Sequence, residues 1–182
     1  MYQLDLTIFR WLNSWVGVND FLDWNILFRA EYLLYVMIVA VFLFYAFDKN
    51  IGRVKLAIIH AFSAGILSRF VFTEIIRFFY DRPRPFDMPA EALAKAGVLV
   101  NKLIEQSPGH SMPSGHASFS FALAMAVYYY YPKTSIVFFL GALAMGAGRV
   151  SAGVHWPSDI FGGMIVGIFS AWLINFIFKK LK

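Results

Sequence analysis

The chain has 182 residues, of which 59% are hydrophobic and 19% aromatic, and its mean hydropathy is +0.61. Soluble domains contain about 45–50% apolar residues, so this composition indicates one domain built for a lipid environment. The absence of cysteine excludes disulfides, thiolate metal sites and cysteine nucleophiles. The net charge of +5 comes from residues scattered over loops and segment ends. Because they form no basic run or stripe, nucleic acid is excluded as a partner.

The N-terminal segment is amphipathic. Residues 4–16 place Leu4, Trp11 and Trp15 on one helical face, opposite polar side chains. Such a helix lies in the membrane interface with its tryptophans at headgroup depth. We therefore assign residues 1–24 to an interfacial anchor, with a ramp for lipid entry as the alternative. No basic segment precedes an apolar core here, so a cleaved signal peptide is not expected.

Five apolar segments follow. Some are shorter than the roughly 20 residues of a full crossing, but each can be extended through its neighbours. The polar stretch 80–112, between the second and third segments, is expected to hold a surface helix over 89–106. We predict an all-α, polytopic integral membrane helical bundle that forms a single domain over residues 1–182. The expected spans are residues 26–47, 56–79, 114–131, 135–147 and 157–178.

Three short polar clusters interrupt the apolar chain, each at the end of an expected span. Because successive spans alternate in direction, all three clusters fall on one side of the membrane. The opposite side carries seven basic residues in very short segments, whereas the cluster side carries eight in much longer ones. By the positive-inside rule the clusters face out of the cytoplasm. The clusters are Arg77 with Arg84-Pro85, Pro113-Ser114-Gly115-His116, and Arg149 with His155 and Asp159.

The arginines of these clusters are suited to phosphate. A guanidinium group is planar, stays charged and matches phosphate oxygens two at a time. Arg77, Arg84 and Arg149 come from different segments, so they could hold a dianionic headgroup from several directions. For any one of them alone, snorkelling from a helix end to the interface is the favoured explanation. Their coincidence with the histidine clusters favours the phosphate site.

The second cluster precedes an apolar helix. Ser114 is suited to cap that helix, whose free N–H groups and positive dipole end would favour an anion. Gly115 has no side chain, so a phosphate oxygen could approach the backbone. His116 in the first turn could donate a proton to a leaving group, since its unperturbed pKa of about 6.5 leaves both protonation states accessible. An ordinary capped helix is the alternative.

The third cluster pairs a histidine with a carboxylate. Pro157 suits the first position of a helix, which places Asp159 in the first turn and His155 just before it. A carboxylate four residues on can hold one imidazole nitrogen and leave the other unprotonated, as an imidazole nucleophile requires. A structural hydrogen bond is the alternative for an isolated pair.

Arg69 lies two helical turns before Arg77, about 12 Å deeper at 1.5 Å per residue. A charge at that depth is costly and usually faces the bundle interior with a partner. We expect that partner to be a carboxylate such as Glu31 or Glu74. Contact with the phosphate of a lipid is the alternative.

Together, the clusters resemble the tripartite signature of the type 2 phosphatidic acid phosphatase superfamily. Its first motif is Lys, six residues, Arg-Pro, and here Arg77 stands in the lysine position before Arg84-Pro85. Pro-Ser-Gly-His is matched in full at 113–116. The third motif, Ser-Arg, then His, then Asp, is matched except that Gly148 replaces serine. The motifs span residues 77–159, and the helical layout extends the likeness over most of the chain.

The resemblance implies a membrane phosphatase acting on lipid phosphates without a cofactor or metal. It assigns His155 as the nucleophile, Asp159 as the group that orients it, and His116 as the acid. Arg77, replacing the usual lysine, keeps the charge and adds bulk, and Gly148 removes one hydroxyl donor. The residues it assigns to the phosphoryl oxygens are Arg77, Arg84, Ser114, Gly115 and Arg149.

We expect a lipid phosphate or diphosphate as substrate, with undecaprenyl diphosphate first because the site faces outward and the chain is small. Phosphatidylglycerophosphate, phosphatidic acid and lipid A phosphates remain open as substrates. The bilayer of the cytoplasmic membrane is the other expected partner, and the sequence does not define an oligomeric state. From a different class, a non-catalytic protein that binds or transports a lipid phosphate would use the same arginines.

Overall fold

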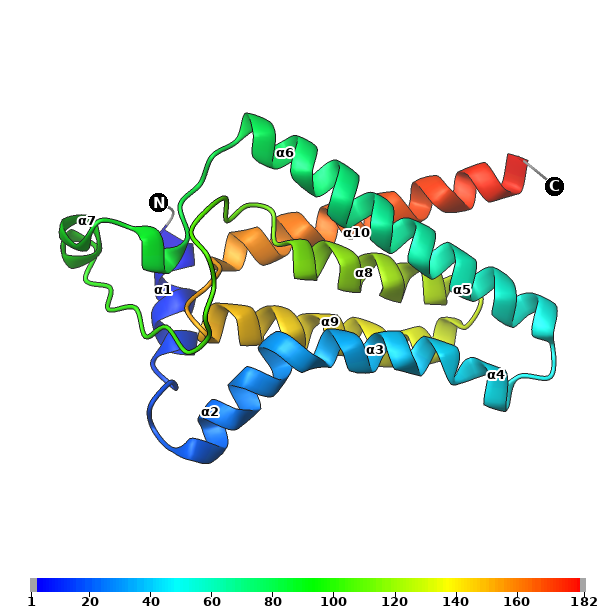
Figure 1. Ribbon diagram of the computed structural model, residues 1–182, viewed down its shortest axis with the longest axis horizontal. Helices are drawn as coiled ribbons and strands as arrows, with labels where there is room; N and C mark the ends of the chain where they lie inside the picture. The colour runs from blue at the N-terminus through cyan, green and yellow to red at the C-terminus, as the bar shows by residue number, and fades with distance from the viewer. Residues whose placement is uncertain (1–2, 181–182) are drawn as a thin grey trace.

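The computed structural model describes residues 3–180, and all regular secondary structure in that range is helical, which confirms the predicted all-α bundle. The long helices run lengthwise through the molecule and define two ends (Figure 1). Residues 1–2 of the expected anchor and Lys182 of the basic C-terminus lie outside the described residues. The elements, including π-helical turns η1 and η2 and the 3-10 turn η3, are α1 (Gln3–Asn13), α2 (Asp20–Leu27), η1 (Phe28–Tyr32), α3 (Leu33–Phe42), α4 (Phe44–Phe47), α5 (Ile51–Ile66), η2 (Leu67–Phe72), α6 (Thr73–Phe79), η3 (Pro85–Asp87), α7 (Ala90–Lys95), α8 (Gly115–Tyr128), α9 (Pro132–Ser151) and α10 (Pro157–Lys180).

Within residues 3–180, four helical stretches are long and apolar enough to cross a membrane. Two are composite: α2, η1 and α3 form Asp20–Phe42, and α5, η2 and α6 form Ile51–Phe79. Helices α9 and α10 supply the others. The first stretch starts at Asp20, within the segment assigned to the interfacial anchor. The reason is Asn19, whose side chain accepts a hydrogen bond from the Leu22 N–H at 2.9 Å and caps the helix.

Helix α8 takes the place of the expected third span but has only 14 residues. At 1.5 Å per residue it is about 21 Å long, less than the roughly 30 Å of a hydrocarbon core. It runs between α5, α9 and α10 and packs against all three. The expected five spans are therefore four long helices and one shorter central helix that the others surround.

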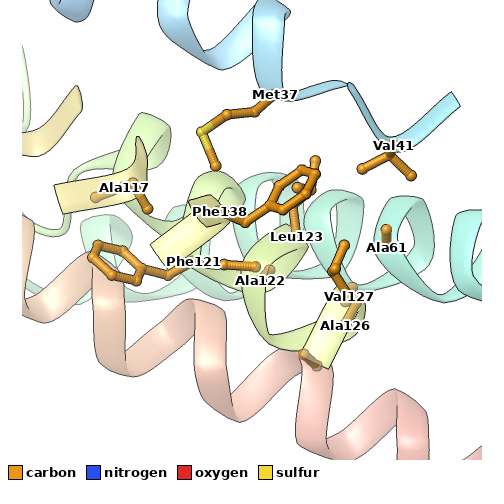
Figure 2. Close-up of a cluster of buried hydrophobic side chains, with 14 of the residues drawn as sticks. Met37, Val41, Ala61, Ala117, Phe121, Ala122, Leu123, Ala126, Val127 and Phe138 are labelled. Atoms are coloured by element: carbon orange, nitrogen blue, oxygen red, sulfur yellow. The ribbon is translucent and has the colours of Figure 1, made fainter. Parts of the chain in front are cut away.

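The main hydrophobic core is built around α8. Figure 2 shows Leu123 of α8 beneath Met37 and Val41 of α3 and beside Phe138 of α9. Leu123 and Val41 have no exposed surface. A helix enclosed on every side is apolar on every face, which explains why α8 lacks an amphipathic pattern. The central helix therefore holds the ends of the motif-bearing helices in register.

Helix α10 packs closely on α8 through two glycines. A Cβ atom at Gly163 would come within 2.7 Å of both the Ala117 Cβ and the Ser114 carbonyl oxygen. At Gly167 it would come within 2.7 Å of the Ala122 nitrogen. Small residues at this spacing let helix backbones approach each other. The contact joins the helix that carries Asp159 to the one that carries His116.

Helix α1 is more than an interfacial anchor. Leu4 and Trp11 are 70% and 63% exposed, as the predicted lipid-facing side requires. On the other face, Phe9 is fully buried and its ring lies 4.9 Å from that of Trp156. The Asn13 side chain donates to the carbonyl oxygens of Asn101 and Ser151 at 2.8 and 2.7 Å. The face that docks onto the bundle therefore carries Asp5, Leu6, Phe9 and Asn13, and of the residues predicted to form the polar face only Asn13 belongs to it.

The polar stretch 80–112 contains less helix than expected. The predicted surface helix over 89–106 is wrong beyond its first turns, because α7 ends at Lys95. Gly97 adopts a φ of +63°, which stops the helix, and the chain then continues without regular structure. Leu103 donates its N–H to the Ala152 carbonyl oxygen at 3.2 Å. This stretch therefore lies across the end of α9, beside the third motif.

Candidate active site

The three motifs converge at the end of the bundle that carries α1 and α7, at the left in Figure 1. The site residues come from helix ends and the loops between them, so the bundle fixes their positions. The structure brings the predicted residues to this one end: Arg77 lies in the last turn of α6, Arg84 just before η3, Ser114 to His116 at the start of α8, Arg149 in the last turn of α9, His155 between α9 and α10, and Asp159 in the first turn of α10.

His155 and Asp159 form a buried pair. Their side chains leave 2% and 0% of their surface exposed, and His155 Nδ1 lies 3.4 Å from Asp159 Oδ2. Pro157 begins α10, as predicted, which puts Asp159 one helical turn after the histidine. The Trp156 backbone N–H also donates to Asp159 Oδ2 at 2.7 Å. The carboxylate is therefore held by the backbone of the loop that carries the histidine.

The other imidazole nitrogen faces an arginine. Arg84 Nη1 lies 3.2 Å from His155 Nε2. A guanidinium can only donate, so Nε2 accepts and Nδ1 carries the proton toward Asp159. Burial lowers the pKa of His155 to about 4, against the opposing pull of Asp159 and with the help of Arg149 and Arg84. The imidazole is therefore neutral at physiological pH, with its lone pair at Nε2, where Arg84 donates to it.

The three motif arginines act on one another. Burial, followed by repulsion from Arg77 and Arg149, lowers the pKa of Arg84 to about 10, so all three are charged at neutral pH. Among the described residues, the buried Nε atoms of Arg77, Arg84 and Arg149 have no hydrogen-bond partner. Buried donors are nearly always paired, and repelling cations gain from an anion between them. This arrangement has the chemistry of an anion site.

Each of these arginines is also anchored by protein oxygens. Arg149 donates to Glu31 Oε1 at 3.0 Å and to Gln106 Oε1 at 2.8 Å, so η1 and the 80–112 stretch both reach the third motif. Arg77 donates to the Pro113 carbonyl oxygen at 3.0 Å and thereby joins the first motif to the second. Anchoring of this kind limits the number of rotamers that the guanidinium groups can adopt.

The second motif caps α8, as predicted. Ser114 is buried, and its Oγ accepts a hydrogen bond from the Ala117 N–H at 3.5 Å. The Ser114 N–H donates to the Asp159 carbonyl oxygen at 3.0 Å, which ties the start of α8 to the first turn of α10. A Cβ at Gly115 would overlap the Arg69 side chain. The glycine therefore makes room for an arginine beside His116.

A cavity of about 200 Å³ opens beside His116. Arg69 lines it at the polar end and forms an ion pair with Glu74, one of the two partners expected for it. Glu74 also pairs with Arg77 at 3.3 Å. The remaining lining is mainly apolar and comes from α3, η2 and α8: Leu34, Ile38, Phe70, Gly115 and Phe119.

Several residues next to the motifs were missed from the sequence. Arg82 donates to Asp159 Oδ1 at 2.7 Å, and Ser111 donates to Oδ2 of the same carboxylate. Asp5 of α1 accepts from Arg82 at 2.8 Å and from the Ser158 N–H at 2.8 Å. The duplicated Arg-Pro of residues 82–85 was a usable signal for Arg82. The sequence gives no such signal for Asp5, because its partners Arg82 and Ser158 are far from it in the chain.

Gly148 has a packing explanation. A Cβ there would lie 2.9 Å from the Ala30 nitrogen and from the Arg29 Cβ. The glycine lets α9 approach η1, and this approach brings Glu31 to Arg149. The serine that the resemblance leads one to expect does not fit without displacing that backbone.

Fold and site together define a class: a multi-pass helical membrane protein with a buried histidine–aspartate pair beside converging arginines. Residues 54–182 match the PAP2 superfamily model, so the chain belongs to the PAP2 superfamily, the type 2 phosphatidic acid phosphatases. The chain is a membrane lipid phosphatase, and its substrate is a lipid phosphate.

Similar proteins cover almost the whole chain. Undecaprenyl-diphosphatase BcrC of Bacillus subtilis is 25% identical over 181 residues, covering 98% of this chain and 84% of that protein. Bacitracin transport permease protein BcrC of Bacillus licheniformis is 26% identical over 180 residues, covering 99% of this chain and 83% of the relative. The crystal structure of Aquifex aeolicus LpxE superposes with a TM-score of 0.69 at 25% identity, covering 96% of each chain.

Proposed function

We propose that the protein hydrolyses a lipid diphosphate without a metal, through a phosphohistidine formed on His155. The Nε2 lone pair attacks phosphorus, a P–N bond forms, and the P–O bond to the lipid breaks. The departing oxygen takes a proton from His116. Burial and then Arg149 lower the pKa of His116 to about 3 in the free protein, so this step requires the bound anionic headgroup to raise that pKa. Water then cleaves the P–N bond, releases inorganic phosphate and restores His155, while His116 recovers its proton. The observation that carries this proposal is the neutral imidazole, held at Nδ1 by Asp159 and facing the cationic cluster at Nε2.

The arginine cluster supports the binding step. Arg77, Arg84 and Arg149 each keep a buried Nε–H without a partner in residues 3–180. A phosphoryl group entering between Arg84 and His155 would accept from the guanidinium and meet the Nε2 lone pair. At the start of α8, Gly115 would add its backbone N–H to the phosphoryl oxygens, and Ser114 would add its hydroxyl, because the Ser114 N–H already donates to Asp159. Preorganised donors of this kind stabilise the charge that develops in the transition state.

Undecaprenyl diphosphate is the proposed substrate, and two observations favour it. One is the likeness over almost the full chain to a protein named as an undecaprenyl-diphosphatase. The other is Arg69, a further cation beside His116 at the head of the cavity lined by Leu34 and Ile38. In the proposed mechanism His116 protonates the leaving group. For a lipid diphosphate that leaving group is the second phosphate together with its apolar chain, so both would lie beside His116. A lipid monophosphate would leave Arg69 without a phosphate partner.

We further propose that the protein resides in the cytoplasmic membrane with the motif end outside. The opposite end carries Lys49 in the short connection between α4 and α5, and Arg53 and Lys55 in the first turns of α5. Lys133 begins α9 at that same end. Basic residues concentrated in short connections favour the cytoplasmic side. Substrate would then reach the site from the outer leaflet.

The test is phosphate release from undecaprenyl diphosphate by the detergent-purified protein in EDTA. Wild type should release phosphate, and His155→Ala should lose at least about 10³-fold. Quenching in an alkaline denaturant, in which the P–N bond survives, with radiolabelled substrate should trap a phosphohistidine in wild type and none in His155→Ala. Full loss of activity in EDTA, restored by a divalent cation, would rule out the metal-independent mechanism.

His116→Ala separates the acid from the nucleophile. With the lipid substrate it should lose about 10²- to 10⁴-fold, the range of general acid catalysis. With a nitrophenyl phosphate, whose leaving group departs without a proton, most of this deficit should disappear. His155→Ala should gain nothing from that substrate. Equal deficits of His116→Ala on both substrates would contradict its role as the acid.

The competing function is non-catalytic binding or transport of a lipid phosphate; the Bacillus licheniformis relative is named a transport permease, but for bacitracin. Phosphatidylglycerophosphate, phosphatidic acid and lipid A are assayed beside undecaprenyl diphosphate. If every lipid stayed intact while still binding, the hydrolytic proposal would fail. Release from one of the monophosphates alone would keep the mechanism and replace the substrate.

A further inference from the structure

Several groups besides His155 hold the carboxylate of Asp159. It is fully buried, and its Oδ1 accepts from Arg82 Nη1 at 2.7 Å. Its Oδ2 accepts from the Trp156 N–H at 2.7 Å and from the Ser111 hydroxyl. These donors leave the carboxylate one orientation, the one that points Oδ2 at His155. Arg82 is the charged member of the set, and its side chain is only 13% exposed.

Arg82 is shared with a second buried carboxylate, that of Asp5 on α1. Arg82 Nη2 donates to Asp5 Oδ2 at 2.8 Å, and Asp5 is 4% exposed. Asp5 Oδ1 accepts from the Ser158 N–H at 2.8 Å, and its Oδ2 accepts from the Ser158 hydroxyl at 2.6 Å. Asp5 therefore satisfies a free N–H in the first turn of α10, the turn that carries Asp159. The chain of contacts runs from Asp5 through Arg82 to Asp159 and His155.

Aromatic packing fixes this chain of contacts in place. The Arg82 guanidinium lies 5.7 Å from the centre of the Trp156 ring, and Trp156 donates its indole N–H to the Pro83 carbonyl oxygen at 3.1 Å. The ring of Phe9 on α1 packs against the same indole, with 4.9 Å between the two ring centres. Helix α1 therefore contacts the loop of the nucleophile through an ionic and an apolar side chain together. A surface anchor would need neither contact.

We propose that Asp5 and Arg82 are positioning residues for the reaction, and that α1 is part of the catalytic apparatus. Arg82 orients Asp159 against His155, and Asp5 both holds Arg82 and offsets part of its charge. Neither residue touches the phosphoryl group in this role. The inference rests on the proposed function only in taking His155 as the nucleophile.

The two residues should shift the pH profile in opposite directions. Without the Arg82 cation, the Asp159 carboxylate stabilises the imidazolium form of His155 more strongly. His155 then stays protonated to higher pH, and the acidic limb of kcat/KM moves up. Without the Asp5 anion, the charge of Arg82 is less offset, the imidazolium is less stable, and the limb moves down.

The other charges around the pair do not change in these variants. They are Arg77 on α6, Arg84 before η3 and Arg149 on α9, and the titratable His116 on α8, whose pKa burial lowers to about 3, also faces the pair. Protonation of the substrate is also the same for every variant. A difference in pH profile between variants therefore reports on His155 and its partners.

The experiment compares Arg82→Gln, Asp5→Asn and the double variant in the full chain, with undecaprenyl diphosphate as substrate. Arg82→Gln should lower kcat by about 10- to 100-fold with KM nearly unchanged, because a misplaced group slows chemistry without removing a substrate contact. Its acidic limb should rise by about 0.5 to 1 pH unit, and that of Asp5→Asn should fall by a smaller amount. Arg53→Gln, at an exposed ion pair with Asp48 in the opposite end, is the matched control and should match wild type.

Three outcomes would overturn the proposal: unchanged kcat and limbs in both variants, limbs that move in the same direction, or a rise in KM alone. If Arg82→Gln does not fold, Arg82→Lys serves instead, because lysine keeps the positive charge but lacks the paired donors of the guanidinium. For Arg82→Lys, kcat should fall while the acidic limb of kcat/KM stays in place. Asp5→Asn then carries the opposite-sign test. If His155→Ala kept the activity of the wild type, the proposed function itself would fail. If His155→Ala were inactive while Arg82→Gln and Asp5→Asn behaved like the wild type, only this inference would fail.

Discussion

Arg69 pairs with a carboxylate of its own helical stretch, and in the proposed function it would also meet a phosphate of the substrate. It pairs with Glu74, which is 49% exposed and also holds Arg77. An ion pair with an exposed partner contributes little stability, so exchanging that partner for a phosphate costs little. Arg69 also lines the cavity beside His116, on the leaving-group side. The second phosphate of a diphosphate would therefore bind the guanidinium of Arg69.

Replacing Arg69 should therefore affect diphosphates more than monophosphates. We expect Arg69→Gln to lower kcat/KM for undecaprenyl diphosphate by about 10- to 100-fold, the value of one charge-assisted contact. For phosphatidic acid the loss should be several times smaller. Phosphate release from both lipids measures the ratio, with Arg53→Gln as the control. Equal losses on the two lipids would assign Arg69 to the structure rather than to the second phosphate.

At the scale of elements, the two π-helical turns lie beside the site. Turn η1 carries Glu31, which pairs with Arg149 at 3.0 Å, and turn η2 carries Arg69. A π-helical turn rotates the residues that follow it relative to an ideal α-helix, and such turns are frequent at functional sites. In this protein, each turn supplies a charged residue that reaches the motif end from inside a long, apolar helix.

The contact between α8 and α10 helps to set the distance between His116 and His155, the two histidines of the proposed mechanism. Gly167→Ala should disturb it, because the new Cβ would overlap the Ser118 carbonyl oxygen and approach the Ala122 nitrogen. We expect a loss of about 1–3 kcal/mol in stability, typical of overpacking, and lower activity. Gly52→Ala is the matched control: its Cβ would meet Asn50 at an ordinary 3.5 Å, so the usual preference for alanine in a helix applies. Thermal unfolding in detergent should show a lower midpoint temperature than wild type for Gly167→Ala but not for Gly52→Ala. Equal midpoints for the two variants would contradict the close contact.

At the scale of the whole molecule, the two ends differ in what they carry. The motif end holds α1, α7 and the long stretch between α6 and α8, whereas the other end has short connections (Figure 1). Lys49 lies in one of those connections, and Lys133 lies in the first turn of α9 next to another. The asymmetry supports the proposed orientation, because short basic connections stay in the cytoplasm.

Single cysteines test this orientation directly, since the chain has none of its own. Ser107→Cys, exposed at the motif end, should react with a membrane-impermeant maleimide added to intact cells. Lys49→Cys, exposed at the other end, should react only after the cells are opened. Labelling of Lys49→Cys alone in intact cells would invert the orientation and place the site in the cytoplasm.

Local signals predicted much of this protein. The motif residues were found because their spacing is short: Pro157 and Asp159 lie within one helical turn, and Ser114 caps the helix that it precedes. Long apolar runs likewise predicted the four long helices. The length of α7 was overestimated, because the expected surface helix ran past Gly97 and the left-handed turn there was not anticipated.

What the sequence by itself determined is therefore the class of the protein, its all-helical architecture and the residues that carry its motifs, since each is written within a few turns of one segment. Only the tertiary structure decided which distant residues complete the site. Asp5 meets Arg82 and Ser158, Glu31 meets Arg149, and α8 becomes the enclosed centre of the bundle. These pairings join residues far apart in the chain. They depend on how whole helices pack, and no local pattern encodes that.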